Sequence, residues 1–354
     1  MVLKKKYDAT PKISTLLSLL VNLIYRKRTS GFFSIEKVFG LVLNTIQQSS
    51  NDSINLEKVE LPFRSSNIFL LFFNLLFILP KRNGLFHITG DVHYIICVLP
   101  RNRTVLTIHD LVFLHTHKGV VRGFLKWTYL MWPVRRAKYI TTISEKSKNE
   151  IIEFTGCDPN KIIVIPNPVD NKLVCPKKNF NSIRPVLLYL GTKPNKNIEI
   201  SILSLYEMDV HLRIIGELTA LQKEVLEKYK IDYSNGIELS DAQIQIEFSN
   251  CDIVLFPSTY EGFGLPVIEG FKAGRPVITS NLEPMNEISQ GAALLVDPIS
   301  VISIREAVIE LVNNEQLRDE LVQRGFEVVK RYEAESIAQQ YVDLWSTIAE
   351  ENKR

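Results

Sequence analysis

Cysteine is scarce in this sequence, which has four among 354 residues: Cys97, Cys157, Cys175 and Cys251. No two of them have the spacing of a metal-ligand pair or a redox pair, and a disulfide framework is not expected in a chain of this length. Four scattered thiols therefore favour a reducing, intracellular compartment.

An excess of charge of one sign is also lacking. The 42 lysines and arginines nearly balance the 39 aspartates and glutamates, which leaves a net charge of +3. This balance argues against a protein that binds nucleic acid by neutralising many phosphates. The hydrophobic fraction of 45% excludes wholesale disorder, and the length suits two domains of middling size.

Long hydrophobic runs are missing as well. The most apolar stretch, residues 68–79 (IFLLFFNLLFIL), has twelve residues and contains Asn74, whereas a helix that spans a bilayer needs about twenty. The pattern favours a buried or partly exposed helix. The alternative is an apolar face that rests in the headgroup layer of a membrane beside Arg64, Lys81 and Arg82. Residues 1–28, at the N-terminus, combine basic residues with an apolar stretch. A signal peptide is the less favoured interpretation of this segment, because no small-residue cleavage site follows the apolar stretch.

The sequence does contain a regular alternation of short β-rich runs and helix-length stretches. Ser34 and Ser144 stand where helix N-caps belong, each before a helix-length stretch. This rhythm predicts a parallel sheet that is covered on both faces. In the first half, the expected strands are residues 16–25, 59–63, 86–89, 104–108, 139–143 and 162–165.

The proline-containing segment Pro166–Asp170 interrupts this alternation and marks the expected domain boundary. Beyond it the alternation restarts, and from residue 302 the pattern is helical. The predicted fold is therefore α/β, with two Rossmann-like doubly wound domains whose strand ends face each other across a cleft. The second half's expected strands are 186–190, 211–215, 253–256 and 276–279, with a helix over 265–273 that Gly274 follows.

The most informative stretch is residues 257–281, PSTYEGFGLPVIEGFKAGRPVITSN. A strand runs into a glycine-containing turn at the N-terminus of a helix, where free backbone N–H groups and the helix dipole favour a phosphate or a sugar hydroxyl. Glu261 precedes the turn and Glu269 lies in the helix. Ionised carboxylates accept hydrogen bonds from vicinal hydroxyls, so we expect both to line one pocket.

These residues resemble the retaining nucleotide-sugar glycosyltransferases of family 4, which have the GT-B fold. The likeness rests on E-GFGLPVI-E followed by AGRPVITSN, and it extends in family order through SIE, HITGD, TIHD, TISEKS, IPNPVD, GTKPNKN and LLVDP. The resemblance implies an acceptor domain over residues 1–168, a nucleotide-sugar domain over 169–335 and a C-terminal helix, 336–354, that crosses back to the first domain.

The family's pattern implies roles for the residues that match it. Glu261 would hold donor sugar hydroxyls, Glu269 the nucleotide ribose, and Lys196 the diphosphate, where an ammonium offsets the charge that develops on the leaving group. His109 resembles the cleft histidine that contacts the donor sugar. The backbone amides that would bind the sugar and the diphosphate belong to Gly262, Phe263, Gly264 and Leu265.

The sequence departs from the family in the loop after residue 190. An arginine is usual there, but this chain has Thr192, followed by Lys193 and Asn195. Thr192 could give phosphate a hydroxyl and an amide, and Lys193 could replace the charge, although a lysine lacks arginine's bidentate fork.

Other candidates have weaker support. Gly31 lies in a loop that the family uses to meet acceptor and phosphate, but ordinary turn geometry explains it equally well. His115 and His117 alternate as a metal pair would, yet no third ligand is near. Asp-x-Asp does not occur, as in family members that need no divalent cation, so we expect neither metal nor cofactor.

The sequence thus predicts a metal-independent, retaining hexosyltransferase. Its expected partners are a GDP- or UDP-sugar donor and a glycan or lipid-linked glycan acceptor, as in bacterial surface polysaccharide and lipopolysaccharide biosynthesis. The expected location is the cytoplasm, with peripheral contact to the inner face of the cytoplasmic membrane left open. The alternatives are a GT-B nucleotide-sugar epimerase, a phosphorylase, or a catalytically silent scaffold.

Overall fold

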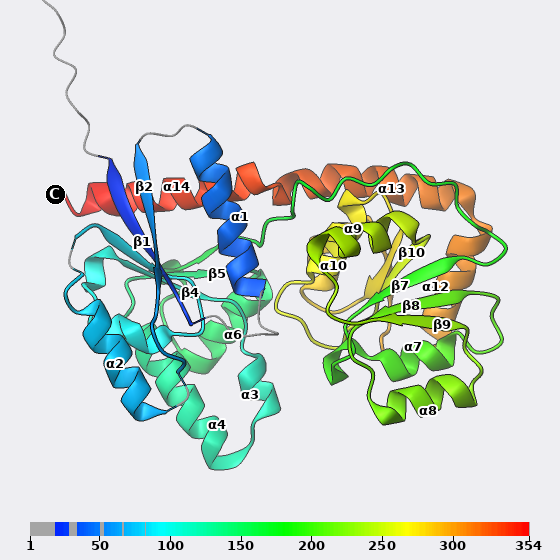
Figure 1. The fold of residues 1–354 in the computed structure, drawn as a ribbon, viewed down its shortest axis with the longest axis horizontal. Coiled ribbons are helices and arrows are strands. Elements are labelled where there is room, and N and C mark those ends of the chain that lie inside the picture. Colours follow the sequence, from blue (N-terminus) through cyan, green and yellow to red (C-terminus); the bar gives the residue numbers. More distant parts are fainter. Residues whose placement is uncertain (1–17, 28–33, 50–52, 66, 82, 354) are drawn as a thin grey trace, which may run out of the picture.

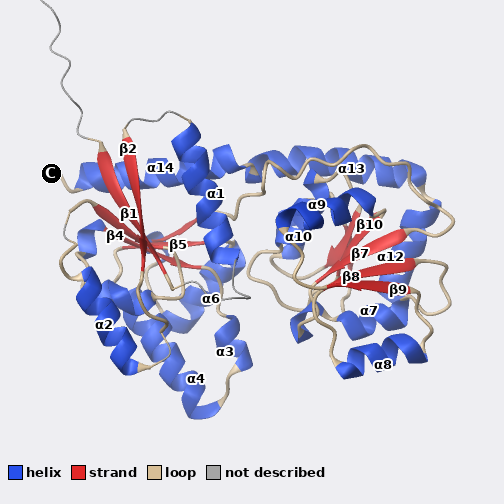
Figure 2. Ribbon diagram, viewed as in Figure 1, coloured by secondary structure: helices blue, strands red, loops and turns tan. Residues whose placement is uncertain are grey.

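The computed structural model describes residues 18–27, 34–49, 53–65, 67–81 and 83–353. Its two α/β halves lie side by side, each built on a six-stranded parallel sheet (Figures 1 and 2). The first sheet has the order β2-β1-β3-β4-β5-β6 and the second β12-β11-β10-β7-β8-β9. The predicted α/β doubly wound fold is therefore confirmed.

The strands of the first sheet are β1 (Leu19–Tyr25), β2 (Ile54–Glu60), β3 (Leu85–Ile88), β4 (Thr104–Ile108), β5 (Tyr139–Thr142) and β6 (Ile162–Val164). The helices that follow them are α1 (Ser34–Gln48), α2 (Ile68–Ile78), α3 (Val112–Thr116), α4 (Gly119–Leu125), α5 (Trp132–Arg136) and α6 (Glu145–Thr155). Ser144 caps α6 as predicted, because its hydroxyl accepts a hydrogen bond from the amide of Ser147.

The strands of the second sheet are β7 (Val186–Leu190), β8 (His211–Ile215), β9 (Tyr233–Gly236), β10 (Ile253–Phe256), β11 (Val277–Ser280) and β12 (Leu294–Val296). Its helices are α7 (Ile198–Ser204), α8 (Ala220–Lys228), α9 (Asp241–Asn250), α10 (Leu265–Lys272), α11 (Met285–Ser289), α12 (Val301–Asn313) and α13 (Glu315–Val329). As expected, Gly274 follows α10 in the left-handed conformation, with φ +65°.

Most strands lie within three residues of their predicted bounds, and the three that do not all lie at sheet edges. β2 occupies 54–60 instead of 59–63, and β9 and β12 were not predicted. An edge strand has one neighbour, so it needs no continuous apolar run. The sequences of β2 (INLEKVE) and β9 (YSNG) are accordingly polar at most positions.

The segment after the boundary is fastened to the second half by a buried arginine, Arg275. Arg275 is 5% exposed, and its guanidinium donates to the carbonyl oxygens of Pro176, Phe248 and Ser249 at 2.9–3.2 Å. The planar guanidinium group has several N–H donors, so it can bond three carbonyl oxygens that belong to two separate segments of the chain. The linker therefore moves with the second sheet.

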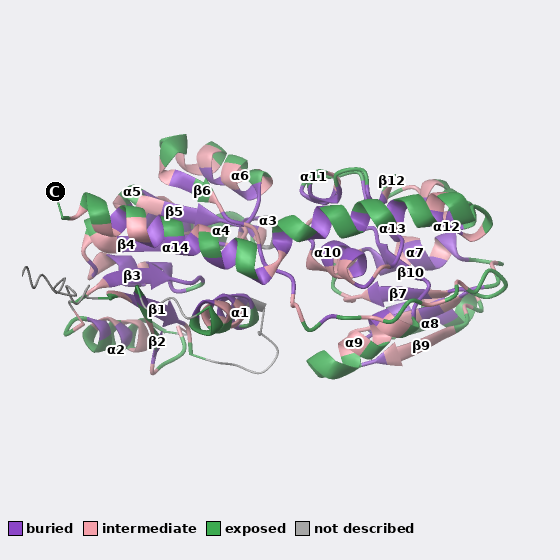
Figure 3. Ribbon diagram, turned by 90° about the horizontal axis from the view of Figure 1, so that it is seen from above, coloured by how far each residue is buried: buried purple, intermediate pink, exposed green. Residues whose placement is uncertain are grey.

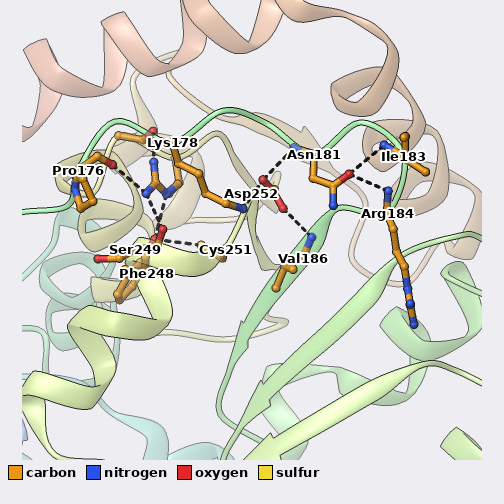
Figure 4. Close-up of polar contacts among 12 residues, drawn as sticks. Pro176, Lys178, Asn181, Ile183, Arg184, Val186, Phe248, Ser249, Cys251 and Asp252 are labelled. Carbon is orange, nitrogen blue, oxygen red and sulfur yellow. Dashed lines mark hydrogen bonds and ion pairs between the residues drawn. The ribbon is translucent and has the colours of Figure 1, made fainter.

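Asp252 makes the second attachment of this linker (Figure 4). Its carboxylate accepts from the amides of Asn181 (3.1 Å) and Val186 (2.9 Å) and pairs with Lys178. These two attachments involve the linker from Pro176 onward. Nearer the boundary, Val169 donates its amide to the carbonyl of Tyr332 at 2.7 Å, so the two chain segments that connect the halves, one outgoing and one returning, lie side by side.

The last helix, α14 (Ala334–Glu351), leaves the second half and packs on α1 and β1 of the first, as Figure 1 shows. Tyr341 and Trp345 are buried there beside Phe39 and His87. The Trp345 indole N–H donates to His87 Nδ1 at 3.2 Å, so the ring's proton sits on Nε2, 2.7 Å from Thr107 Oγ1.

This buried histidine predicts a pH dependence of stability. Burial lowers the pKa of His87 to about 3, whereas an unfolded histidine has the ordinary value near 6.5. Only the unfolded state gains a proton between these values, so stability is complete above about pH 6.5 and falls as the pH drops towards 3, by up to about 1.4 kcal/mol per pH unit. Urea titrations at pH 7, 6 and 5 should show a steeper decline for the native chain than for His87→Gln. Parallel slopes would contradict this assignment.

The apolar run 68–79 forms α2, but the structure buries only two of the helix's residues, Asn74 and Ile78. Asn74 donates to the Phe63 carbonyl (2.9 Å) and the Tyr94 hydroxyl (2.9 Å) and accepts from the Phe63 amide (3.1 Å), which explains a polar residue at this position. The favoured interpretation, a buried or partly exposed helix, is therefore confirmed in its partly exposed form (Figure 3). Among the described residues, no helix combines the length and apolarity that crossing a bilayer requires.

Candidate active site

A cleft of about 800 Å³ lies where the carboxyl ends of the two sheets face each other. The chain reaches it in the loops after β1, β3, β4 and β5 of the first half and after β7 and β10 of the second. Side chains from distant positions are thereby brought together, as expected for open parallel sheets. The second half lines the cleft with Lys193, Asn195, Lys196, Glu261, Gly262, Phe263, Gly264, Leu265 and Pro266.

Glu261 is held in this cleft by three donors on one carboxylate oxygen. Its Oε1 accepts from Lys196 Nζ (2.6 Å), Ser258 Oγ (2.6 Å) and Asn195 Nδ2 (3.2 Å). In the part of the chain that the structure describes, no residue donates to Oε2. The carboxylate is thus fixed in orientation and keeps one oxygen as an acceptor for a hydroxyl group.

Lys196 is positioned by its own loop as well as by Glu261. Its ammonium lies 4.6 Å from the centroid of the Phe256 ring. Gly191 makes room for the side chain: it has φ +93°, and a Cβ there would lie 3.0 Å from the lysine's methylene groups. Gly191 therefore leaves the space that the Lys196 side chain occupies.

The turn before α10 is pressed against the first half. A Cβ on Gly262 would lie 2.7 Å from Asp110 Cβ, and the Gly262 carbonyl accepts from Ser144 Oγ at 2.8 Å. Lys146 Nζ donates to the Glu261 carbonyl at 3.0 Å. Gly264 occupies the N-cap of α10 with φ +106°, and the first helical residues, Leu265 and Pro266, line the cleft, although Pro266 has no amide N–H.

His109 lines the cleft at the end of β4, where the sequence placed it. Its Nε2 donates to the Thr89 carbonyl at 2.7 Å, so a backbone contact fixes the ring, and its own carbonyl accepts from Ser147 Oγ at 3.2 Å. The next residue, Asp110, also lines the cleft, and burial raises the pKa of its carboxyl group.

Glu269 does not share the cleft with Glu261, contrary to the expectation of a common pocket. The turn of α10 between them carries it to a separate pocket of about 210 Å³, beside Lys37, Asp170 and Asp241. Burial raises the pKa of Glu269, Lys37 opposes this rise, and the two aspartates add to it. Lys37 in turn bonds Asp241 at 2.8 Å, so this pocket also joins the two halves.

Thr192 is not brought to the cleft either. Its hydroxyl donates to the Glu217 carbonyl at 2.5 Å, whereas the neighbouring Lys193 lines the cleft.

Gly31 lies outside the described residues, as does the side chain of His115, and His117 is exposed with Nδ1 2.9 Å from the Phe113 carbonyl. Within the described ranges, three or more potential metal ligands do not cluster anywhere.

Comparison with known proteins agrees with this geometry. Residues 173–328 match the model of glycosyl transferases group 1, and residues 62–173 match that of glycosyltransferase family 4. The O-antigen chain mannosyltransferase RfbU of Salmonella typhimurium is 30% identical over 258 residues, which are 70% of each chain. The O-antigen chain mannosyltransferase B of Escherichia coli is 26% identical over 274 residues, 70% of this chain and 71% of the relative.

This chain belongs to the group 1, family 4 glycosyltransferases. Its fold is similar to that of a solved structure, Anabaena Alr3699/HepE in complex with UDP and glucose, with a TM-score of 0.71, 15% identity and coverage of 93% of this chain and 100% of that one. The two-sheet architecture is accordingly GT-B.

The first half of this glycosyltransferase lines the cleft with residues that the sequence analysis did not select. Arg26 lies after β1 and pairs with Glu36 (2.8 Å) and with Asp91, while His93 is 2.6 Å from the Tyr129 carbonyl. Burial lowers the pKa of His93. The sequence could have indicated these cleft-lining residues. The motifs SIE and HITGD and the basic loop after the first strand each follow the end of a predicted strand, where ligands of parallel sheets bind.

Proposed function

We propose that this glycosyltransferase moves a hexose from a UDP- or GDP-sugar to a hydroxyl of a glycan or lipid-linked glycan, with retention of anomeric configuration. The observation that carries this proposal is Glu261 fixed on Lys196 beside the N-terminus of α10, inside the cleft. Glu261 offers an acceptor for sugar hydroxyls, whereas Lys196 and the N-terminus of α10 offer positive charge for a diphosphate. The HepE complex with UDP and glucose supports a nucleotide-sugar donor.

The biosynthetic setting that we propose is bacterial surface polysaccharide. RfbU and mannosyltransferase B are both named as O-antigen chain mannosyltransferases, and the matches to them cover about 70% of this chain. A mannose donor with a guanosine base is therefore the first candidate to test, ahead of uridine donors.

The proposed reaction is a same-face displacement. The bond from the anomeric carbon to the diphosphate oxygen breaks, the bond to the acceptor oxygen forms on the same face, and the acceptor proton passes to the leaving phosphate. Glu261 Oε2 would hold the sugar, and the α10 amides with Lys196 and Lys193 would stabilise the leaving group. Lys193, rather than Thr192, would replace the missing arginine, because it lines the cleft. This route needs no metal ion.

The acceptor would enter against the first half. Arg26, Asp91 and His93 offer a cation, a carboxylate and an imidazole at this side of the cleft, all suited to hydroxyl groups. Rotation of the halves about the two segments that connect them, 166–170 and 330–333, would close the cleft and exclude water from it.

Calorimetry with UDP and GDP, followed by transfer assays with UDP-glucose, UDP-galactose and GDP-mannose, tests this function. We expect one nucleotide to bind and its sugar to reach an added acceptor. Epimerised sugar from donor alone would instead indicate an isomerase, and failure of both nucleotides to bind would indicate a scaffold.

We also predict that Glu269→Ala raises the donor dissociation constant about tenfold or more. The nucleotide of a donor in the cleft would extend to the neighbouring pocket, where the half-buried Glu269 carboxylate would accept hydrogen bonds from the ribose hydroxyls and contribute at least about 1.4 kcal/mol. Calorimetry with the preferred nucleotide measures it. Glu310→Ala, on the exposed face of α12, is the matched control and should bind normally. Unchanged binding in Glu269→Ala would refute the ribose role.

A further inference from the structure

α2 exposes an apolar face that nothing in the described chain covers. Ile68 is 75% exposed and Phe69 73%, and the helix contains neither an acidic nor a basic residue. Leaving several large side chains of one helix in water is unfavourable, so a contiguous face of this kind indicates a binding surface. The other exposed apolar residues on and beside α2 are Phe63, Phe72, Phe73, Leu76, Phe77 and Leu79.

A second exposed apolar segment follows in α4 and in the π-helix Lys126–Met131 that continues it. Val120 is 90% exposed, Phe124 64% and Trp127 59%. The sequence analysis did not select this segment, because its apolar residues are separated by glycine and basic residues.

Both segments belong to the same end of the first half. α2 is held to the short 3₁₀ helix His93–Cys97 through the bond from Asn74 to Tyr94, and the π-helix is held to it through the contact of His93 with the Tyr129 carbonyl. Figure 1 shows α2 and α4 projecting on the same side of the first half, away from α14. We call the exposed apolar residues of both segments the α2–α4 surface.

The charge of these segments is one-sided. Residues 61–82 contain three basic residues and no acidic one, and residues 111–144 contain six basic residues and no acidic one. Outside these two segments the chain has 33 basic and 39 acidic residues, so the excess of positive charge is local to them. The basic residues are Arg64, Lys81 and Arg82 in the first segment and Lys118, Arg122, Lys126, Arg135, Arg136 and Lys138 in the second.

We propose that the α2–α4 surface binds an anionic lipid bilayer. Exposed aromatic and aliphatic side chains insert at the headgroup boundary, and neighbouring lysines and arginines are attracted to anionic headgroups. A second copy of this chain fits less well, since it would place two acid-free, basic surfaces against each other.

The second of these segments also reaches the cleft, which gives the bilayer a role. Phe113, Leu125 and Tyr129 line the cleft from α3, α4 and the π-helix. A chain docked on this surface would open the acceptor side of its cleft towards the membrane, so its acceptor would be a membrane-anchored glycan. Only this last step depends on the proposed transferase function, because the lipid binding stands on the surface itself.

The test is sedimentation of the full chain with vesicles of phosphatidylcholine containing 30% phosphatidylglycerol, and with pure phosphatidylcholine. We expect binding to the anionic vesicles that weakens at least fivefold in 0.5 M salt or without the anionic lipid. Phe69→Ser with Phe72→Ser, and Phe124→Ser with Trp127→Ser, should each lower it at least tenfold. Ile299→Ser with Ile302→Ser, equally exposed on the second half, is the matched control and should leave it unchanged.

Three results would overturn the proposal: a native chain that stays in the supernatant with anionic vesicles, surface variants that sediment like the control, or a dimer in light scattering that these variants dissolve. Melting temperatures within 3 °C of the native value verify folding. Transfer to a water-soluble acceptor should persist in the surface variants. Its absence from the native chain as well would contradict the transferase, whereas the sedimentation result would still decide the lipid surface.

Discussion

Replacing Glu261 by glutamine lowers kcat/KM by about 10²–10³-fold, the loss typical of removing one group that stabilises charge in an active site. Glutamine keeps the volume of the side chain. However, its carbonyl oxygen alone must now accept from Lys196, Ser258 and Asn195, and its amide nitrogen presents donors where, in the proposed function, Oε2 would accept from the donor sugar. The lysine also loses its counter-charge, so its ammonium is no longer held in place.

Steady-state transfer with the preferred sugar nucleotide measures this loss. Glu310→Gln provides the matched control, because it makes the same chemical change on an exposed helix face. Thermal unfolding of both variants should match the native chain, since Glu261 contributes to the cleft rather than to a hydrophobic core. Activity within threefold of the native value in Glu261→Gln would show that the carboxylate does not touch the donor.

The sequence was sufficient to select Glu261, Lys196 and His109 as members of one cleft, because each stands directly after or near a predicted strand end. It could not reveal that Glu261 and Lys196 bond each other, since 65 residues separate them and only tertiary packing brings them to 2.6 Å. It was wrong to place Glu269 in the same pocket, because counting positions along a helix does not say which side of the helix a neighbouring domain covers.

The fold followed from the sequence for a related reason. Central strands of a parallel sheet are buried on both faces, so their apolar runs are visible, and β4, β7, β8 and β10 have the predicted bounds. The edge strands β2 and β9 lack that signal, because polar residues fill most of their positions. The exposure of α2 was equally invisible, because an apolar run looks the same whether protein or another medium covers it.

Trp345→Ala destabilises the first half by about 3–5 kcal/mol, the range for removing a fully buried tryptophan. The indole stacks with Tyr341 at 5.7 Å between ring centroids and donates to His87, so its loss creates a cavity and leaves a buried imidazole nitrogen without its donor. α14 is the second connection between the halves, and Trp345 is its most bulky anchor.

Urea unfolding monitored by far-UV circular dichroism measures this effect, and proteolysis locates it. We expect an early transition in which α14 and the first half become cleavable while the second sheet, which Arg275 and Asp252 fasten to the linker, stays protected. Trp345→Phe keeps most of the volume but loses the N–H group, so it should cost clearly less than the alanine variant. If Trp345→Ala unfolds both halves in one transition at the native midpoint, α14 does not hold the first half together, and the two sheets derive their stability independently of it.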